Sequence, residues 1–379
     1  MTSNNDKKVL NVPALRFPEF SGEWIHKTID EIFELRNGYT PSKANQSFWN
    51  NGTIPWFRME DIRLNGGILY DAIQHITPEA VKGSGLFEPY SIILATTATI
   101  GEHAMIIADS LANQRFTNFK VRKSLSLRYA PYYLYYYFFR IDKWCLKNTN
   151  AGGLLSVDIP SLKRKPIYAP LIDEQIKIAK LLRLIDERIA TQNKIIDKLQ
   201  SLIRGIAQNI TCSNKPNVHI SECLECSSST LQESDVFEHG AYPVYGANGI
   251  VGYFDDYSTE DEAVHIIKDG SGVGTVSYVT GKCSATGTLN TLQAKDGYLL
   301  QYLYYMLKVF NFEPYKTGMA IPHIYFKDYG KAKIFCPSYT EQLKYVELLS
   351  AIDNKLSVEQ RILTNLSLQK QYLLRQMLI

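Results

Sequence analysis

Three closely spaced glycines form the stretch of this sequence that most suggests phosphate chemistry. Gly270, Gly272 and Gly274 follow an apolar segment, and backbone amides in such a turn could cradle a phosphate. The stretch lacks the glycine spacing of a dinucleotide fingerprint, and no Gly-Lys-Ser/Thr follows it, so an ordinary turn is the favoured interpretation. A nucleotide-binding enzyme that uses residues 270–274 stays open as an alternative.

A group of cysteines and one histidine has the composition of a zinc site. Cys212, His219, Cys223 and Cys226 include a Cys-x2-Cys pair close to a histidine. The two paired cysteines align with aliphatic residues in the first half of the chain, which favours burial as small hydrophobic side chains. We therefore predict no metal site. No catalytic triad, carboxylate pair or helicase motif is visible, so we predict no catalytic residue.

Polar and basic side chains at expected strand ends and glycine turns suggest recognition of nucleic acid. Arginine, glutamine and asparagine can read base edges in the major groove, and lysine and arginine can contact phosphates. The candidates are Arg58, Glu60, Arg63, Gln114, Arg115 and Lys120 in the first half, and Tyr245, Asn248, Lys268, Ser271 and Asn290 in the second. The alternative for the basic residues is an ordinary solvated face.

A duplicated scaffold must position these candidates. Residues 173–206 align with residues 340–373 without a gap, which indicates two versions of one half-unit. Residues 29–35 likewise match residues 220–226. Between such landmarks the halves differ, and residues 55–90 have no visible counterpart in residues 236–260. Divergent loops on a repeated scaffold are expected when each half presents different residues to a ligand.

The duplicated segments carry the heptad pattern of a coiled coil. Apolar residues recur at alternating steps of three and four, which lets two helices bury a continuous seam. The predicted seam comprises Ile178, Leu182, Ile185, Ile189, Gln192, Ile196 and Leu199 in the first copy, and Leu349, Ile352, Leu356, Glu359, Leu363 and Leu366 in the second. Glu359 and Lys370 make the second seam less regular. Asp173 and Thr340 are the expected N-caps.

Two aromatic segments, residues 133–138 and 302–307, could stack on unpaired bases. Their presence at matching places in both halves favours an alternative, in which each forms a helix packed into a hydrophobic core.

The bulk composition fits a soluble protein of two or more domains. The chain has 379 residues, of which 45% are hydrophobic and 21% charged. A net charge of +3 does not by itself identify a nucleic-acid binder. Six scattered cysteines suit a reducing compartment. No secretory signal or membrane-spanning run is visible, so we expect a cytoplasmic protein.

In their order along the chain, these features resemble the specificity subunits of type I restriction-modification systems. The resemblance rests on the opening residues 12–20 with Trp24, and on a Pro-x3-Glu-Gln start at each long helix. The duplication and the strongly diverged interiors belong to the same pattern. The resemblance covers essentially the whole chain.

That resemblance implies an α+β fold, in which two pseudo-repeated target recognition domains are joined by two long antiparallel coiled-coil helices. The implied boundaries are a disordered lead at 1–11, a first recognition domain at 12–168, a first long helix at 169–213, a second recognition domain at 214–336 and a second long helix at 337–379.

The resemblance also implies a non-catalytic function in double-stranded DNA recognition. Each recognition domain would read one half of a bipartite site, while the helices set the unread spacer and dock methyltransferase subunits. The implied partners are two adenine-N6 methyltransferase subunits and two motor-nuclease subunits. S-adenosylmethionine, ATP and magnesium would bind only to these partners, and this chain would hold no cofactor. A coiled-coil adaptor that binds only protein is the remaining alternative.

Overall fold

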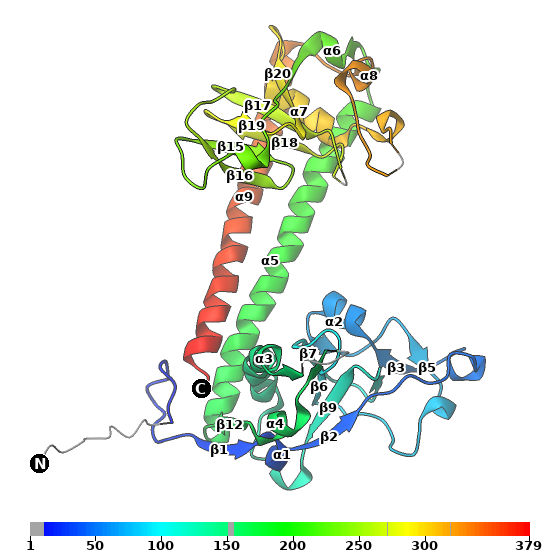
Figure 1. Cartoon of the computed structure of the whole chain (residues 1–379), viewed down its shortest axis with the longest axis vertical. Coiled ribbons are helices and arrows are strands. Elements are labelled where there is room, and N and C mark those ends of the chain that lie inside the picture. Colours follow the sequence, from blue (N-terminus) through cyan, green and yellow to red (C-terminus); the bar gives the residue numbers. More distant parts are fainter. Residues whose placement is uncertain (1–10, 151–154, 271, 319) are drawn as a thin grey trace, which may run out of the picture. The chain divides into compact units, whose positions relative to one another are not determined.

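The polypeptide forms two compact units (Figure 1). The structure, a computed structural model, describes residues 11–150, 155–270, 272–318 and 320–379. The first unit extends to residue 190 and includes residues 364–379, and the second comprises residues 191–363. Each unit therefore contains part of both long helices. Except for residue 11, the predicted disordered lead lies outside the described residues, and the other expected domain boundaries remain predictions.

The two long helices are α5 (Ile172–Cys212) and α9 (Tyr339–Gln376), coloured green and orange to red in Figure 1. Contacts within each unit establish that they run antiparallel, which confirms this part of the expected fold. Both begin one residue before the expected N-cap. Ahead of α9, the Ser338 hydroxyl donates to the Glu341 carboxylate at 2.7 Å. Ser338, and not the expected Thr340, therefore supplies the side-chain hydrogen bond at the start of this helix.

Two sheets form the body of the first unit, in the strand orders β2-β9-β6-β7-β4 and β5-β3-β8. Two-stranded ladders β1-β12 and β10-β11 flank them. The strands are β1 (Ile25–Thr28), β2 (Phe33–Asn37), β3 (Ile54–Phe57), β4 (Ile68–Leu69), β5 (His75–Ile76), β6 (Ser91–Ala95), β7 (His103–Ile106), β8 (Leu111–Ala112), β9 (Phe116–Val121), β10 (Thr149–Asn150), β11 (Ser156–Val157) and β12 (Pro166–Ala169). The helices besides α5 are α1 (Ile29–Ile32), α2 (Met59–Asn65), α3 (Pro131–Lys147) and α4 (Ile159–Arg164).

Strand β6 shows how the larger sheet separates two cores. Side chains alternate between the faces of a strand. Ile92 and Leu94 belong to a core shared with α3, whereas Ile93 and Ala95 belong to a core shared with the smaller sheet. Both faces of the strand are consequently apolar, as its uninterrupted hydrophobic sequence predicts.

The second unit repeats this plan with the sheets β14-β20-β17-β18 and β16-β15-β19, and the ladder β13-β21. Its strands are β13 (Val218–His219), β14 (Leu224–Ser228), β15 (Tyr242–Gly246), β16 (Gly249–Phe254), β17 (Glu262–Ile267), β18 (Val276–Thr280), β19 (Ser284–Ala285), β20 (Leu289–Ala294) and β21 (Lys333–Ile334). Its shorter helices are α6 (Ile220–Cys223), α7 (Leu300–Val309) and α8 (Phe326–Tyr329).

The parallel pair β15–β19 reveals a repeat that the sequence concealed. It corresponds to the parallel pair β3–β8 of the first unit. In the chain, β3 follows β2 and β15 follows β14, whereas β8 directly precedes β9 and β19 directly precedes β20. Residues 55–90 have no counterpart visible in the sequence of residues 236–260, yet β3 and β15 occupy equivalent places in the two units. The sequence of β3 differs from that of β15 while its place in the fold is kept.

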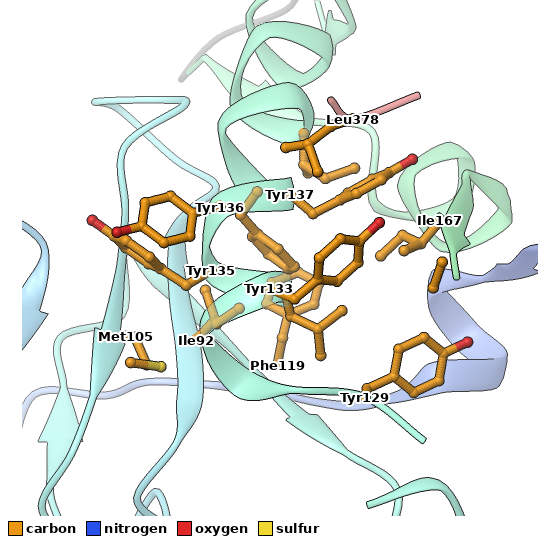
Figure 2. Packing of buried hydrophobic residues seen from close by; sticks show 14 of the residues in the cluster. Ile92, Met105, Phe119, Tyr129, Tyr133, Tyr135, Tyr136, Tyr137, Ile167 and Leu378 are labelled. Carbon is orange, nitrogen blue, oxygen red and sulfur yellow. The ribbon is translucent and has the colours of Figure 1, made fainter. Parts of the chain in front are cut away.

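The two aromatic segments form helices α3 and α7, and their tyrosines are buried, which confirms the core interpretation. Figure 2 shows Tyr133 and Tyr137 of α3 on the side of Ile167 and Leu378 in this core. The hydroxyl of Tyr133 donates to the carbonyl of Tyr168 at 2.7 Å. This bond satisfies the hydroxyl of a tyrosine whose ring is buried away from water.

The glutamine of each Pro-x3-Glu-Gln motif ties a long helix to an aromatic helix. Gln175 Oε1 accepts from the backbone N–H of Ala130 at 2.9 Å, just before α3. Gln342 Oε1 does the same for Leu299, just before α7, at 2.8 Å. Both glutamines are buried and satisfy amides that have no partner within the helix they precede. The motif is thus explained by packing within each half-unit.

Candidate nucleic-acid interface

In the first unit, the parallel pairing of β3 with β8 brings two sets of candidates to one edge. Phe57 is the partner of Ala112, and the Asn113 amide donates to the Phe57 carbonyl at 3.1 Å. Because the strands run the same way, the residues that follow them emerge together. Arg58 and the turn at residues 113–115 are therefore neighbours.

The loop after β6 joins the same edge. The Thr96 amide donates to the Arg115 carbonyl at 2.9 Å, and Arg63 at the end of α2 lies 3.8 Å from the Glu102 carboxylate. Within this loop Ala98 has φ of 65°, a left-handed conformation that costs energy for a residue other than glycine. We call residues 58–63, 96–102 and 113–115 the first loop cluster.

Arg58 and Arg63 of the first loop cluster form loose ion pairs. Arg58 Nε is 3.9 Å from Glu60, whose side chain is 59% exposed, and the Arg63 side chain is 64% exposed. Surface pairs of this kind contribute little to stability, about 0–1 kcal/mol. Phosphate groups could therefore replace the carboxylates at small cost. Gln114 is exposed beside them and accepts a hydrogen bond from the Thr40 hydroxyl.

Lys120 does not belong to the first loop cluster. It lies in β9, four residues beyond Phe116, which places it roughly 13 Å along the strand from the turn. Its ammonium pairs with the carboxylate of Glu88. If Lys120 contacts DNA, it does so from a part of the surface outside the first loop cluster.

The second unit builds a matching arrangement on β15 and β19. The Thr286 amide donates to the Tyr245 carbonyl at 2.8 Å, and the Lys268 amide to the Thr288 carbonyl at 3.0 Å. These two bonds correspond to those of Asn113 and Thr96 in the first unit. We call residues 245–249, 268–270, 272–274 and 286–288 the second loop cluster.

Most candidates of the second half that the structure describes lie in the second loop cluster. Asn248 is exposed in the β15–β16 turn. Lys268 is half-buried, with its ammonium 3.3 Å from the Ser228 hydroxyl. Tyr245 is half-buried, its ring centroid 5.6 Å from that of His265, and burial raises the pKa of its hydroxyl. Ser271 lies outside the described residues.

Asn290 requires a correction. It is 4% exposed within β20, and its side-chain amide donates to the Tyr329 hydroxyl at 3.1 Å. Its carbonyl oxygen accepts from the Ser228 hydroxyl at 3.2 Å. A buried side chain with both ends satisfied is not available to a base edge. The sequence suggested exposure because asparagine is mostly a surface residue.

A pair in the second loop cluster was missed. The Nδ1 atom of His323 lies 2.6 Å from Oδ1 of Asp269, and both side chains are about one-third exposed. Asp269 directly follows Lys268, but its partner is 54 residues away in sequence. Asp269 could have been found from the sequence, because it is next to Lys268, which was already a candidate at an expected strand end. No local sequence pattern marks His323.

The glycine-rich stretch is a turn between strands. Gly270 and residues 272–274 lie between β17 and β18, and the Gly274 amide donates to the Ile267 carbonyl at 2.9 Å. Phosphate loops rely on the N-terminus of a helix that follows them, and a strand follows here. The nucleotide-binding alternative is therefore not favoured.

One member of the cysteine group lies in a hydrophobic core. Cys223 is fully buried, and its thiol donates to the Ile220 carbonyl at 3.3 Å. Burial raises the pKa of that thiol to about 12. Within the described ranges, no three histidine, cysteine, aspartate or glutamate side chains lie close enough together to hold a metal ion.

The predicted seam residues line the contact between α5 and α9 within each unit. All of them are buried or half-buried, namely Ile178, Leu182, Ile185, Ile189, Gln192, Ile196, Leu199, Leu349, Ile352, Leu356, Glu359, Leu363 and Leu366. Lys370, which made the sequence pattern irregular, pairs with Asp186 at 2.6 Å and lies over the ring of Phe139. None of the described helices is long and apolar enough to cross a membrane.

Known proteins share this arrangement along most of the chain. Residues 21–201 and 218–368 match the family model described as type I restriction modification DNA specificity domain. The chain is 33% identical over 359 residues to the type I restriction enzyme EcoprrI specificity subunit of Escherichia coli, and the match covers 87% of each protein. It is 31% identical over 187 residues to the type I restriction enzyme MjaIX specificity subunit of Methanocaldococcus jannaschii, which covers 47% of this chain and 42% of that one.

The solved S subunit of a type I restriction-modification system from M. genitalium has a similar fold. The TM-score is 0.64 at 17% identity, with 97% of this chain and 99% of that chain covered. At this level of identity the likeness concerns the fold.

Proposed function

We propose that this chain, which belongs to the type I restriction-modification DNA specificity family, acts as the non-catalytic subunit that selects the DNA sequence. In this proposal the first and second loop clusters each read one half of a bipartite double-stranded site. Arg58, Gln114 and Arg115 are the proposed readers in the first unit, and Asn248 and Lys268 in the second. The base-specific contacts are made in the major groove.

One observation carries the proposal. The backbone bonds that build the two loop clusters are repeated, whereas the side chains they present are different. A conserved frame with exchanged side chains is what two readers of different base sequences require. A purely structural repeat would need no such divergence at matching positions.

The long helices have two roles in this proposal. They set the length of the unread spacer, and they dock two methyltransferase subunits. Two motor-nuclease subunits complete the restriction complex. S-adenosylmethionine, ATP and magnesium belong to these partners, which also supply adenine-N6 methylation and DNA cleavage. The small net charge of +3 is compatible with this role, because partners that close around DNA add further phosphate contacts.

Mapping of N6-methyladenine across a genome tests the proposal. Cells that carry this chain together with a cognate methyltransferase are compared with cells that carry the methyltransferase alone. The expected result is a bipartite methylated motif that depends on this chain. Active methyltransferase without a new motif would refute the specificity role and favour the adaptor alternative, which predicts binding to protein only.

A further inference from the structure

The pair formed by Asp269 and His323 has the features of a base-reading group. A carboxylate can only accept hydrogen bonds, so Nδ1 of His323 is the donor in the 2.6 Å contact with Oδ1. The second carboxylate oxygen, Oδ2, takes no hydrogen bond from any residue in the described part of the chain. With the carboxylate about one-third exposed, Oδ2 is an oriented acceptor available to a ligand.

The backbone holds this pair in place from both sides. The Ile324 amide donates to the Lys268 carbonyl at 2.9 Å, and the Gly270 amide to the Pro322 carbonyl at 3.0 Å. His323 also forms two backbone bonds with Thr317, at 2.7 and 2.9 Å. Since the backbone is hydrogen-bonded on both sides of the pair, the Asp269 carboxylate would lose little conformational entropy on binding a ligand.

The first unit has the same frame with neutral side chains. There Thr97 is bridged to Ser156, as Asp269 is bridged to His323. The scaffold therefore does not require an acid at this position. The acid is a property of the second unit alone, as expected of a side chain that serves sequence selection.

A carboxylate on a surface that faces DNA is repelled by phosphates unless it meets a hydrogen-bond donor. In the major groove the donors are exocyclic amines, N4 of cytosine and N6 of adenine. Guanine and thymine present acceptors at the equivalent places and would be rejected. Lys268, next to Asp269, supplies a positive charge that offsets the repulsion between the carboxylate and nearby phosphates.

We propose that Asp269, oriented by His323, determines specificity at one position of the second half-site by accepting a hydrogen bond from an exocyclic base amine. The proposal rests on the proposed function, because it assumes that the second loop cluster faces DNA. It assigns Asp269 to base contact and makes His323 a positioning residue.

Base analogues test this contact directly. The complete chain, assembled with its methyltransferase, is titrated with duplexes in which one amine of the second half-site is deleted at a time. Purine replaces adenine, and pyrimidin-2-one replaces cytosine. At one position other than the methylated adenine, deletion should weaken binding by the wild-type complex roughly tenfold. The analogue that gives this effect identifies the base.

Substitutions assign the effect to Asp269. In D269A the side chain has no acceptor. In D269N the amide oxygen stays on Nδ1–H of His323, so the amide nitrogen, a donor, takes the place of Oδ2. In these variants the amine deletion should change binding by less than about twofold, the tolerance expected when two changes are independent. D261N is the matched control. Asp261 is exposed and precedes β17, whereas Asp269 follows it, so about 20 Å of strand separates the two. D261N should respond like the wild type.

Each other outcome has a definite meaning. No amine-sensitive position, or equal sensitivity in D269A, would overturn the inference while leaving the bipartite motif intact. Failure of both Asp269 variants to assemble, with D261N assembling normally, would make the pair structural and also overturn it. Loss of all sequence preference in the wild-type complex would instead refute the proposed function.

Discussion

Gln192 of α5 donates a hydrogen bond to the backbone carbonyl of Glu359 in α9 at 3.1 Å, and its amide also contacts the Glu359 carboxylate. The two residues hold the same position in the two copies of the repeat, 167 residues apart. In an antiparallel pair of related helices, equivalent positions meet at one layer only. This polar layer therefore marks a unique register between the helices.

Replacement of Glu359 by leucine should lower the free energy of unfolding by about 1 kcal/mol, because Gln192 is buried and would lose its side-chain partner. Urea unfolding followed by helical circular dichroism measures the change. The double variant Q192L/E359L should recover that stability while losing the feature that fixes register. An E359L chain as stable as the double variant would contradict this account.

Replacement of Gln114 by alanine should relax the first half-site at one position and leave the second half-site and the spacer unchanged. The reason is that Gln114 is exposed in the first loop cluster and does not support the core. Methylation mapping of cells that carry the variant gives the result. If all sites weaken equally without a change of motif, Gln114 contacts phosphate instead.

Replacement of Asn290 by alanine should destabilise the second unit by about 1–3 kcal/mol, since the hydroxyls of Tyr329 and Ser228 lose their buried partner. Thermal unfolding provides the measurement. The motif methylated by the surviving complex should be that of the wild type. A selective loss of one base preference would return Asn290 to the set of readers.

The second unit should lose stability in mild acid because of His265. Burial lowers the pKa of His265 to about 4, and neither ring nitrogen has a hydrogen-bond partner among the described residues. Its pKa in the unfolded chain is about 6.5, so between these values the unfolded state binds more protons. The free energy of unfolding should therefore fall as the pH falls from about 6.5, by up to roughly 3 kcal/mol at pH 4.

Unfolding of H265L across this pH range tests the assignment, since the variant should show a flatter pH dependence than the wild type. The control is H239L, which removes an exposed histidine of the same unit and should keep the wild-type slope. Equal slopes for H265L and the wild type would show that other groups cause the acid sensitivity.

Matched shortening of α5 and α9 by one heptad each should change the spacer of the methylated motif while keeping both half-sites. Removal of seven residues from each helix preserves the seam pattern. The readout is again the methylated motif. An altered half-site sequence with an unchanged spacer would mean that the helices do not set the separation.

The sequence by itself determined the duplicated plan, the two long helices and the aromatic helices. These features follow from periodic patterns of neighbouring residues, and apolar residues spaced for a seam must be buried in any arrangement.

Only the tertiary structure decided which distant residues meet. The pairing of β3 with β8 and of β15 with β19 builds each loop cluster, and these partners lie far apart in the chain. The same holds for Lys370 with Asp186 and for His323 with Asp269. Local sequence cannot specify such contacts, because one polar residue can satisfy its hydrogen bonds with water, a neighbour or a distant partner. The choice depends on the energy of the whole folded chain.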